Sequence, residues 1–350
     1  MKETVTYPMQ AVTLNPADPR WLDFISTRPD THIFHHPAWM KVISECYGYR
    51  AFIFALCDQS DQLLAGIPIM ETNALWTGRK WISLPFSDHC KPVSENPETL
   101  ASLLELITLE FQNLAIPSLE IRWQVPATQP FKTNLQHVLS RLTLEEDPMK
   151  MLEQFHHNHR RNIRTAQKRE IYITKSNSRA DLKAFYRLHT YTRQRQGIPV
   201  QPWRFFELLG KYVIEPGLGY ILLAYHRDTC IASAIFLHWQ KTLVYKYGAS
   251  RHDALSLRPN NLLFWHVIES ACQNGFESLG LGRTHVGNLG LRDFKSRWGA
   301  DEFPLAYSNI ETKSSKNLVD KILPVGKFLI RNAPAWVCRA SGELFYKQFA

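Results

Sequence analysis

Apolar runs of strand length recur along this chain in two similar groups. In each group two runs are joined by a polar turn, which predicts a β-hairpin, at residues 51–57 with 63–70 and again at residues 220–225 with 231–239. Helical patterns precede each hairpin, and a further apolar or aromatic run follows it. This shared order, with an offset of about 167 residues, predicts two copies of one mixed α/β unit, and chance similarity of two short hairpins is the alternative.

Helical periodicity, with apolar residues three or four positions apart, fills much of the remaining sequence. Proline at the first turn and glycine just past the end mark a helix over residues 37–47. A long helix is predicted from Asp147 to about Glu170, and residues 125–146 show no clear pattern. The other predicted helices cover about 100–114, 181–193, 202–213, 260–271 and 291–298, and the other predicted strands cover 80–84, 119–123, 171–173, 243–249 and 276–281.

The basic residues of the chain are concentrated in two segments. Its 350 residues carry a net charge of +9. Residues 150–170 hold six basic and two acidic side chains, and residues 313–350 hold seven and two, so the rest of the chain is neutral. Such local basicity indicates a polyanionic partner, such as lipid headgroups or RNA, or else solvated helix faces. Residues 315–331 also predict a basic amphipathic helix, which either packs on its own core or lies on an acidic membrane face.

Length and cysteine usage bound the class of protein. A chain of this length predicts about two domains of roughly 150 residues each. The six cysteines are far apart and form no CxxC pair, which favours a reducing compartment. The first residues have no apolar core of a secretory signal, and no apolar run approaches the ~20 residues that cross a bilayer. We therefore expect a cytoplasmic protein, at most peripheral at the inner face of the plasma membrane.

Residues 245–300 contain the richest candidate chemistry. Polar or glycine-containing clusters rich in Arg, Lys, Tyr and Asn stand there at the ends of apolar segments, at 245–250, 258–261, 280–284 and 290–300. Loops at such places present side chains to ligands, and this composition indicates an anionic ligand.

These clusters resemble those of the FemAB-related branch of the GNAT acyltransferase superfamily. Residues 84–90, Leu-Pro-Phe-Ser-Asp-His-Cys, resemble part of the degenerate repeat that precedes the main domain in such proteins. In the second half, the resemblance rests on Thr192–Gly197, the hairpin with Ala232, Tyr245–Ser250, Arg258–Asn260, Gly282-Arg283, and Leu291–Lys295 leading into Trp298-Gly299.

The resemblance implies an α/β fold with mixed sheets, built from two tandem GNAT-like domains at 1–146 and 147–310, and followed by a helical extension at 311–350. It implies transfer of an acyl or aminoacyl group onto a primary amine of a cell-envelope, peptidoglycan or exopolysaccharide precursor by direct aminolysis. The co-substrate is then acyl-CoA or aminoacyl-tRNA, with no tightly bound cofactor. The partners are a small-molecule or lipid-linked amine acceptor, tRNA, and an acidic membrane that residues 313–350 contact.

Two residues are candidates for catalysis. Lys295 matches the lysine that is important in the aminoacyl transferases, and a fixed positive donor near the carbonyl stabilises the oxyanion of aminolysis. A solvated helix lysine is the alternative. Asp88 is a candidate to hold the acceptor ammonium or to help remove its proton, and a turn aspartate is the alternative.

Substrate-binding candidates come from the same clusters. Arg195 and Arg283 supply forked donors for an anionic acceptor, and Tyr247 offers a hydroxyl unless it is simply a core aromatic residue.

The predicted donor loop holds Arg258, Asn260 and Asn261, where acetyl-CoA-dependent GNAT enzymes have an Arg/Gln-x-x-Gly-x-Gly/Ala loop. There is no glycine between Gly248 and Gly275. A tight backbone cradle for pyrophosphate is therefore doubtful, although Arg258 and the amides that open the helix still offer contacts to a phosphate.

Two other hypotheses follow from the residues. The histidine clusters at 32–36 and 156–159 lack acidic and cysteine partners at zinc spacings, so we predict no metal site. The alternative to an enzyme is a non-catalytic polyanion-binding protein that uses the basic segments to bind RNA or an acidic membrane.

Overall fold

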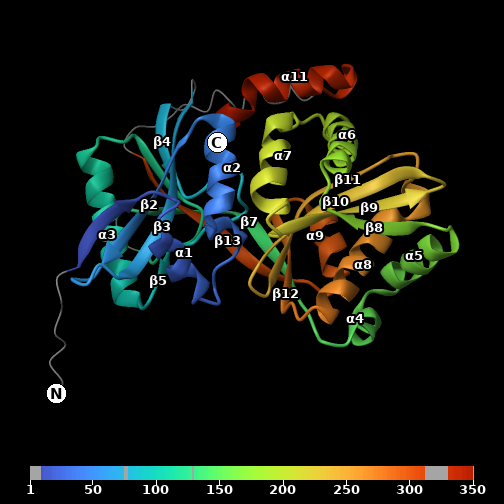
Figure 1. The fold of residues 1–350 in the computed structure, drawn as a ribbon, viewed down its shortest axis with the longest axis horizontal. Helices are drawn as coiled ribbons and strands as arrows, with labels where there is room; N and C mark the ends of the chain where they lie inside the picture. Colours follow the sequence, from blue (N-terminus) through green and yellow to red (C-terminus); the bar gives the residue numbers. More distant parts are fainter. Residues whose placement is uncertain (1–8, 75–77, 128–129, 312–329, 350) are drawn as a thin grey trace. The chain divides into compact units, whose positions relative to one another are not determined.

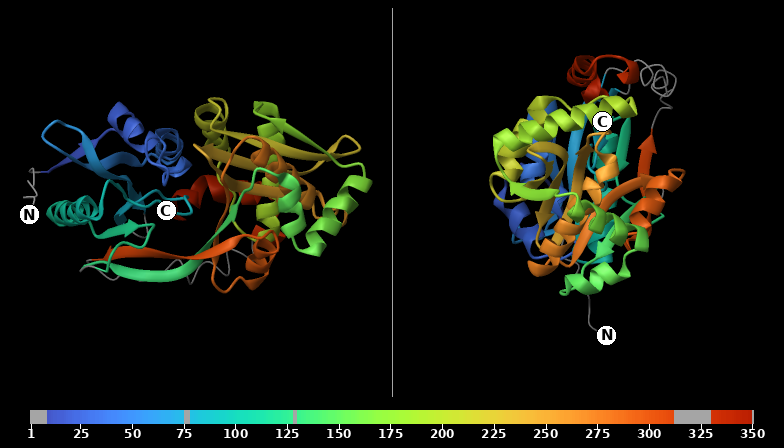
Figure 2. Two further views of the ribbon diagram at one scale, coloured as in Figure 1. Left: turned by 90° about the horizontal axis from the view of Figure 1, so that it is seen from below. Right: turned by 90° about the vertical axis from the view of Figure 1, so that its right-hand side faces the viewer.

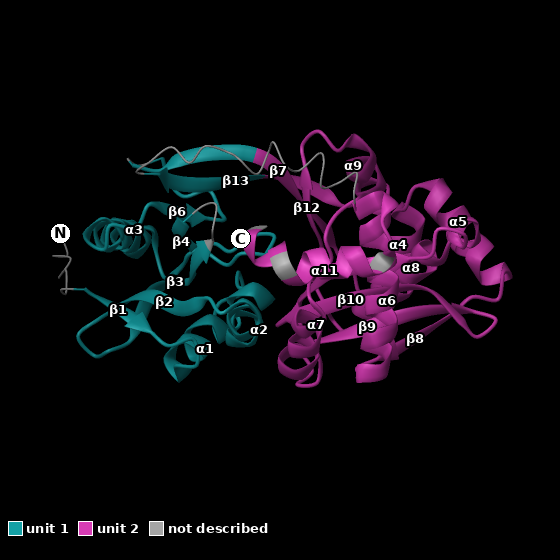
Figure 3. Ribbon diagram, turned by 90° about the horizontal axis from the view of Figure 1, so that it is seen from above, with its two compact units in different colours: residues 1–135, 305–315, 350 teal, residues 136–304, 316–349 magenta. Residues whose placement is uncertain are grey.

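The computed structural model describes residues 9–74, 78–127, 130–311 and 330–349. The chain forms two compact units, shown in Figure 3: unit 1 contains residues 1–135, 305–315 and 350, and unit 2 contains residues 136–304 and 316–349. The compact units divide at 135/136 and 304/305, inside the strands Lys132–Thr143 and Asp301–Glu311. The predicted domain boundaries at 146/147 and 310/311 therefore stay a prediction. Most of the amphipathic helix predicted at 315–331 lies outside the described residues.

Unit 1 is a mixed sheet with helices. The predicted hairpin forms as β2 and β3, and β4 continues it antiparallel, whereas β6 lies parallel to β4. The last strand, β13 (Asp301–Glu311), pairs antiparallel with β6. The other elements are β1 (Gln10–Leu14), α1 (Pro19–Ser26), α2 (Pro37–Tyr47), β2 (Arg50–Cys57), β3 (Leu63–Ala74), β4 (Gly78–Ile82), β5 (Val93–Ser94), α3 (Pro97–Asn113) and β6 (Ser118–Ile121).

Local sequence signals set the limits of the unit 1 helices. Pro37 occupies the first turn of α2, and Gly48 ends the helix in the left-handed region at φ 73°. Asn96 and Thr99 bond each other's backbone amides in a capping box that starts α3. Both helices confirm predictions made from the sequence.

Unit 2 repeats this order of elements (Figure 1). The second predicted hairpin forms as β9 and β10, β11 continues it antiparallel, and β12 lies parallel to β11. The elements are β7 (Lys132–Thr143), α4 (Pro148–Gln154), α5 (His157–Lys168), β8 (Tyr172–Ser176), α6 (Arg179–Gln196), α7 (Trp203–Leu209), β9 (Gly219–His226), β10 (Thr229–Trp239), β11 (Thr242–Ser250), α8 (Pro259–Gln273), β12 (Ser278–His285), α9 (Leu289–Ser296) and α11 (Ala335–Phe345).

Helices cover both faces of the unit 2 sheet (Figures 1 and 2). Helices α5 and α8 pack on the face that holds Leu222, Ala234 and Phe236, and α6 and α7 cover the other face. Helix α7 continues into a single π-helical turn at Gly210–Ile214, so the predicted helix over 202–213 is confirmed in extent.

The single helix predicted from Asp147 to Glu170 is wrong. The chain leaves the helical conformation at Phe155 and His156, whose ψ angles are 145° and 139°, and this separates α4 from α5. Phe155 is fully buried against Trp265 and Trp298, and the His156 side chain caps the new helix at the Asn158 amide. Apolar residues recur at helical spacing on both sides of the break because α4 and α5 pack on the same core, and this made them look like one helix.

The described part of the C-terminal extension packs on unit 2. The Cys338 thiol is buried and donates to the Ile198 carbonyl. A side chain at position 342 would place its Cβ 1.8 Å from the Val200 carbonyl oxygen, so only glycine permits this approach of α11. The core-packing alternative was stated for residues 315–331, most of which lie outside the described residues, and membrane contact by 313–350 stays a prediction. No helix among the described residues is long and apolar enough to span a membrane.

Candidate functional site

Strands β11 and β12 separate part-way along their length. Their parallel pairing covers only Thr242–Val244 with Ser278–Gly280, and both strands continue beyond it without pairing each other. We call the point where this pairing ends, together with the unpaired continuations of both strands, the unit 2 cleft. Parallel strands that splay in this way expose backbone groups and side chains of both strands to a ligand. Four of the clusters predicted from the sequence lie at or next to this point.

A β-bulge marks each side of the unit 2 cleft. On β11, Ile235 opposes Tyr247 and Phe236 opposes Tyr245, so Lys246 is the extra residue. On β12, the register with β7 shifts between Gly280 and Arg283. Bulges bend a strand and re-aim its side chains, and they are common beside active sites. Both strands therefore turn away from regular pairing at the same level.

Gly282 produces the β12 bulge. Its φ of 74° lies in the left-handed region, which side chains with a Cβ adopt only at a cost of about 1–2 kcal/mol. This conformation lets the Gly282 carbonyl accept a hydrogen bond from Lys295 Nζ at 2.7 Å instead of joining a strand ladder.

Lys295 is a buried cation. Asn288 caps α9, and this short helix places Lys295 back over β12, where the side chain is only 5% exposed. Its Nζ donates to the Gly282 carbonyl and, at 2.8 Å, to Thr284 Oγ1. The alternative of a solvated helix lysine is wrong. A positive charge in a low-dielectric site acts on developing negative charge more strongly than one in water.

Tyr247 is half-buried on the face of β11 that α6 and α7 cover. Its ring packs against His189 at 5.6 Å and Phe206 at 5.4 Å, between ring centroids. Neighbouring Tyr245 points to the opposite face and contacts Phe264. Gly248 leaves room for it, because a Cβ there would lie 1.7 Å from the Tyr245 hydroxyl oxygen. The two tyrosines thus tie both faces of β11 to the surrounding helices.

The predicted arginines come from different elements of unit 2. Arg195 lies in the last turn of α6 and is half-buried, and no carboxylate of a described residue lies within 4.0 Å of its guanidinium. Arg283 follows Gly282 on β12 and is also half-buried. Burial raises the pKa of Tyr346, and the charges of Arg193 and Arg283 oppose that rise.

The start of α8 offers few free amides. The Arg258 amide donates to Leu255, and the Asn261 amide donates to the Arg258 carbonyl. Pro259 has no amide hydrogen. Of positions 258–261, only the Asn260 amide donates to no backbone acceptor among the described residues. A pyrophosphate cradle needs several such amides, so this turn does not fit the pyrophosphate of a coenzyme A held in that way.

Asn261 has a structural role that the sequence did not indicate. It is buried, and its Nδ2 donates to Nδ1 of His159 at 2.8 Å. His159 Nε2 then carries the hydrogen and donates to the Phe294 carbonyl at 3.3 Å. Burial lowers the pKa of His159, in agreement with this neutral form. The ring also stacks on Trp298, 4.2 Å between centroids.

Sequence reasoning gave no site role to three residues that hold Lys295 or its neighbour on α9. His159, Thr284 and the Gly282 carbonyl all contact Lys295 or its immediate neighbour on α9. Glycine in an apolar strand was the one available signal, because it indicates a bulge. His159 and Thr284 sit in patterns that look like ordinary helix and strand positions.

Asp88 belongs to unit 1, whereas the other seven predicted residues belong to unit 2. It is half-buried in the turn after β4, and its carbonyl accepts from the Tyr307 hydroxyl at 2.7 Å. Its negative charge also acts on the buried guanidinium of Arg122. The turn role is observed, and a role with the acceptor amine stays a prediction.

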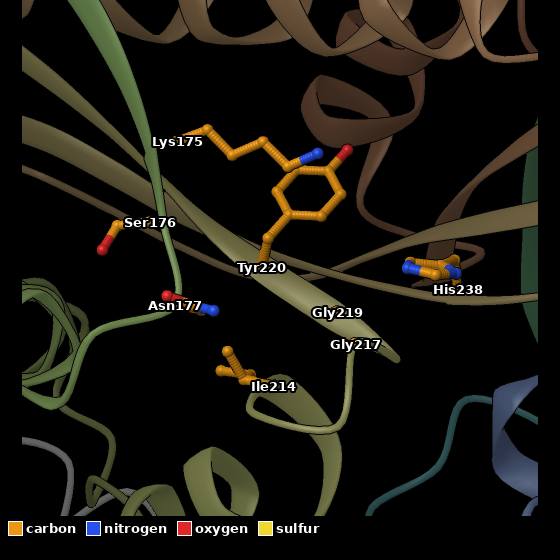
Figure 4. Close-up of a pocket in the computed structure, with 8 residues that line it drawn as sticks. All are labelled: Lys175, Ser176, Asn177, Ile214, Gly217, Gly219, Tyr220 and His238. Carbon is orange, nitrogen blue, oxygen red and sulfur yellow. The ribbon is translucent and has the colours of Figure 1, made fainter.

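A separate hollow lies at the opposite end of the unit 2 sheet (Figure 4). It has a volume of about 360 Å³, and Lys175 Nζ lies there 4.2 Å from the Tyr220 ring centroid. None of the residues predicted from the sequence lines it. Among the described residues, no group of three or more His, Cys, Asp and Glu side chains is arranged to hold a metal.

Comparison with known families decides the class of unit 2. Residues 153–296 match the model of the acetyltransferase (GNAT) domain. They form a GNAT acyltransferase domain. This range contains both cleft strands, α5, α8 and Lys295. The acyltransferase class implied by the sequence resemblance is confirmed, and GNAT membership implies an acyl-CoA co-substrate, which the start of α8 does not fit in the usual way.

Solved structures show the same fold over nearly the whole chain. FemX is 14% identical with a TM-score of 0.69, and the match covers 90% of this chain and 100% of FemX. The C-terminal domain of a putative lysylphosphatidylglycerol synthetase from Agrobacterium fabrum is 14% identical with a TM-score of 0.55, covering 89% of this chain and 95% of that one.

A tandem GNAT protein from the clavulanic acid biosynthesis pathway is 8% identical with a TM-score of 0.52, covering 88% of this chain and 100% of that one. No curated protein matches the sequence. The two-unit fold expected from the sequence is therefore shared with FemX and with a tandem GNAT protein.

Proposed function

We propose that this GNAT protein transfers an acyl or aminoacyl group onto a primary amine of a cell-envelope precursor by direct aminolysis. The observation that carries the proposal is Lys295, a buried ammonium fixed by Gly282 and Thr284 beside the unit 2 cleft. The names of FemX and of the lysylphosphatidylglycerol synthetase support a cell-envelope acceptor and an aminoacyl donor. We place the reaction in the cytoplasm, with the protein peripheral at the membrane.

The chemistry needs one bond to form and one to break. The amine nitrogen attacks the acyl carbon, the bond from that carbon to the donor oxygen or sulfur breaks, and the proton lost by the amine ends on the departing atom. Negative charge develops on the carbonyl oxygen between these events. We propose that Lys295, whose Nζ donates to the Gly282 carbonyl and to Thr284 Oγ1, stabilises that charge.

Side chains of unit 2 hold the acceptor. Arg195 and Arg283 bind its phosphate or carboxylate groups with forked donors, and the Tyr247 hydroxyl orients it. Asp88 is proposed to bind the acceptor ammonium or to help remove its proton, because only a neutral amine attacks.

The start of α8 favours an aminoacyl ester over a coenzyme A thioester as donor. Arg258, Asn260 and Asn261 were predicted to contact the donor. The Asn261 side chain is committed to His159, which leaves the Arg258 guanidinium and the Asn260 amide for that role. Two groups fit a single phosphate better than a pyrophosphate.

The test is a transfer assay with alternative donors. Purified protein is incubated with labelled acetyl-CoA or labelled aminoacyl-tRNA and with a nucleotide-sugar peptide or an aminated lipid, and amide formation is measured. Lys295→Ala should lower the rate by about 100-fold or more. Lys241→Ala is the matched control, because that lysine is exposed and paired with Glu277. Full transfer by Lys295→Ala would refute the role of Lys295.

A further inference from the structure

Helix α5 and the residue after it carry an unusual concentration of positive charge. Residues 157–169 contain five basic side chains and no acidic one. Those of Arg161, Arg164, Lys168 and Arg169 are exposed, and that of Arg160 is half-buried. The helix lies at the edge of unit 2 in Figures 1 and 3.

None of these five cations is neutralised by a neighbour. Within the described part of the chain, no carboxylate lies within 4.0 Å of any of them. Elsewhere in unit 2, three exposed cations do have such partners, Arg179 with Glu207, Lys241 with Glu277 and Arg251 with Asp253, whereas others such as Lys183 and Arg204 have none among the described residues. Five like charges on little more than three helical turns repel each other, and a polyanion relieves that repulsion.

The charges form a regular row. Arg160, Arg164 and Lys168 are four residues apart, so they share one stripe with about 6 Å between successive side chains along the helix axis. Arg161 borders the same stripe. The opposite side of the helix is occupied, because Ile163 and Ala166 are buried in the core that α8 shares. Such a row matches a chain of phosphates better than one isolated anion.

The exposed face of α5 fits RNA better than a membrane. A helix that lies in a membrane interface buries apolar side chains among the lipids. None of the large apolar side chains exposed in the described residues lies on α5, and its apolar residues already face the core. The other exposed residues of α5 are His157 and Gln167, and Asn158, Asn162 and Thr165 are half-buried. All are polar side chains of the kind that bond phosphate and ribose oxygens.

Helix α5 is attached directly to the helix that carries Lys295. The His156 amide donates to the Arg297 carbonyl at 3.0 Å, and His159 contacts the Phe294 carbonyl, the residue before Lys295. A ligand along the charged row therefore ends close to α9. The surface and the candidate catalytic residue form one rigid arrangement within unit 2.

We propose that Arg160, Arg161, Arg164 and Lys168 form a binding surface for the sugar–phosphate backbone of a structured RNA. Binding itself needs no transfer chemistry. A second role rests on the proposed function: if the donor is an aminoacyl-tRNA, this surface holds it beside Lys295.

The experiment measures the affinity of the full chain for deacylated bulk tRNA over a series of salt concentrations. In the test variant, Arg161→Gln, Arg164→Gln and Lys168→Gln are combined. The control variant combines Arg179→Gln, Lys241→Gln and Arg251→Gln, which removes the same charge from cations that have partners. The test variant should bind at least tenfold more weakly near 100 mM salt, and its salt slope should fall by about 2 to 3. The control should change less than about threefold.

Equal weakening of both variants would mean that only net charge matters and would overturn the proposal. Stronger binding to vesicles of anionic lipid than to tRNA, with the same three residues responsible, would also overturn it in favour of a membrane surface. Arg164→Glu alone, checked for an unchanged melting temperature, gives a second reading in case the triple variant folds poorly. Lys295→Ala should bind tRNA like the wild type, so a failure of the transfer chemistry is distinguishable from a failure of RNA binding.

Discussion

Units 1 and 2 have the same order of strands, and each contains one short parallel pairing. They differ in what lies beyond the last residue pair of that pairing, which we call the gap. In both, a hairpin and a third antiparallel strand are followed by a helix and then by a parallel strand, β6 in unit 1 and β12 in unit 2. The parallel pairing is short in each: β4 and β6 share two registered pairs, and β11 and β12 share three. The predicted repeat is therefore present, and the difference lies beyond the last pair.

Unit 1 closes this gap with its own chain. The Cys90 amide donates to the Arg122 carbonyl, and the Cys90 carbonyl accepts from Ser83 Oγ, so the segment after β4 folds back between the two strand continuations. Cys90 is fully buried, and burial raises the pKa of its thiol, which makes it an unreactive thiol. Leu84 and Phe86 both adopt φ of 62° to make this return.

Charge follows the same contrast. The closed gap of unit 1 is bordered by an internally neutralised set: Glu120 bonds both Lys80 and Arg122. Burial opposes ionisation of Glu120, but the two cations outweigh it and lower its pKa to about 2. In unit 2, Lys295 bonds a carbonyl and a hydroxyl instead. The comparison teaches that a buried cation bonds a carboxylate in unit 1 and a carbonyl and a hydroxyl in unit 2, where we propose that it acts in transfer.

The largest expected effects come from removing the buried cation of each unit. The first is Arg122 of unit 1. Arg122→Met should lower the free energy of unfolding by about 3 kcal/mol, because Glu120 loses one of its two cationic partners inside the protein. Amide transfer per folded molecule should change little. Chemical denaturation and the transfer assay, run on the same preparation, check both statements. A free energy of unfolding that changes by less than about 0.5 kcal/mol would show that Lys80 alone is enough to hold the Glu120 carboxylate.

The converse substitution should separate function from stability. Lys295→Met keeps the length of the side chain and removes its charge, so transfer should fall by about 100-fold to 1,000-fold. The free energy of unfolding should stay equal or rise, since a buried charge is no longer desolvated. A large loss of stability instead would identify Lys295 as a structural residue like Arg122.

Glycine at position 248 tests how closely β11 is packed. Gly248→Ala should lower the free energy of unfolding by about 1–3 kcal/mol, because the new Cβ meets the Tyr245 hydroxyl oxygen at 1.7 Å. Tyr245→Phe removes that oxygen, so the double variant should recover part of the loss in a denaturant melt. Absence of any recovery would mean that backbone strain, not this contact, is responsible.

The smallest expected effect concerns acid. Burial lowers the pKa of His32, His35 and His36 in unit 1, that of His35 to about 4, with Lys91 lowering the pKa of the first two further and Asp30 raising that of His35. The unfolded chain then binds more protons below pH 6.5, so stability is full above that value and is lost as the pH falls toward 4.

His32→Phe should therefore reduce the dependence of unfolding free energy on pH by up to about 1 kcal/mol per pH unit between pH 6.5 and 4. Denaturant melts at several pH values measure it. His36→Gln is a comparison for a histidine outside the tilted ring contact of His32 with His35. Identical slopes for wild type and His32→Phe would show that the unfolding of unit 1 does not take up this proton.

The sequence by itself determined the elements whose signals are local. Turn residues and alternating apolar runs predicted both hairpins, proline and glycine marked the ends of α2, and the clusters at 245–300 were placed at the strand and helix ends where the cleft forms. It also predicted the short helix that carries Lys295. Strand β7 was not predicted, since most of its first half is exposed and shows no alternation.

Only the tertiary structure decided what these residues contact. The sequence left a solvated helix lysine open as the alternative for the catalytic candidate Lys295, and the packing of α9 over the Gly282 bulge removed that alternative. His159 was one of several histidines until the structure showed that it joins α8 to α9. Closure of the unit 1 gap depends on hydrogen bonds between residues 32 positions apart, Cys90 and Arg122. Periodicity reports which face of an element is buried, but burial of a charge and the partner of a hydrogen bond are set by segments distant in the chain.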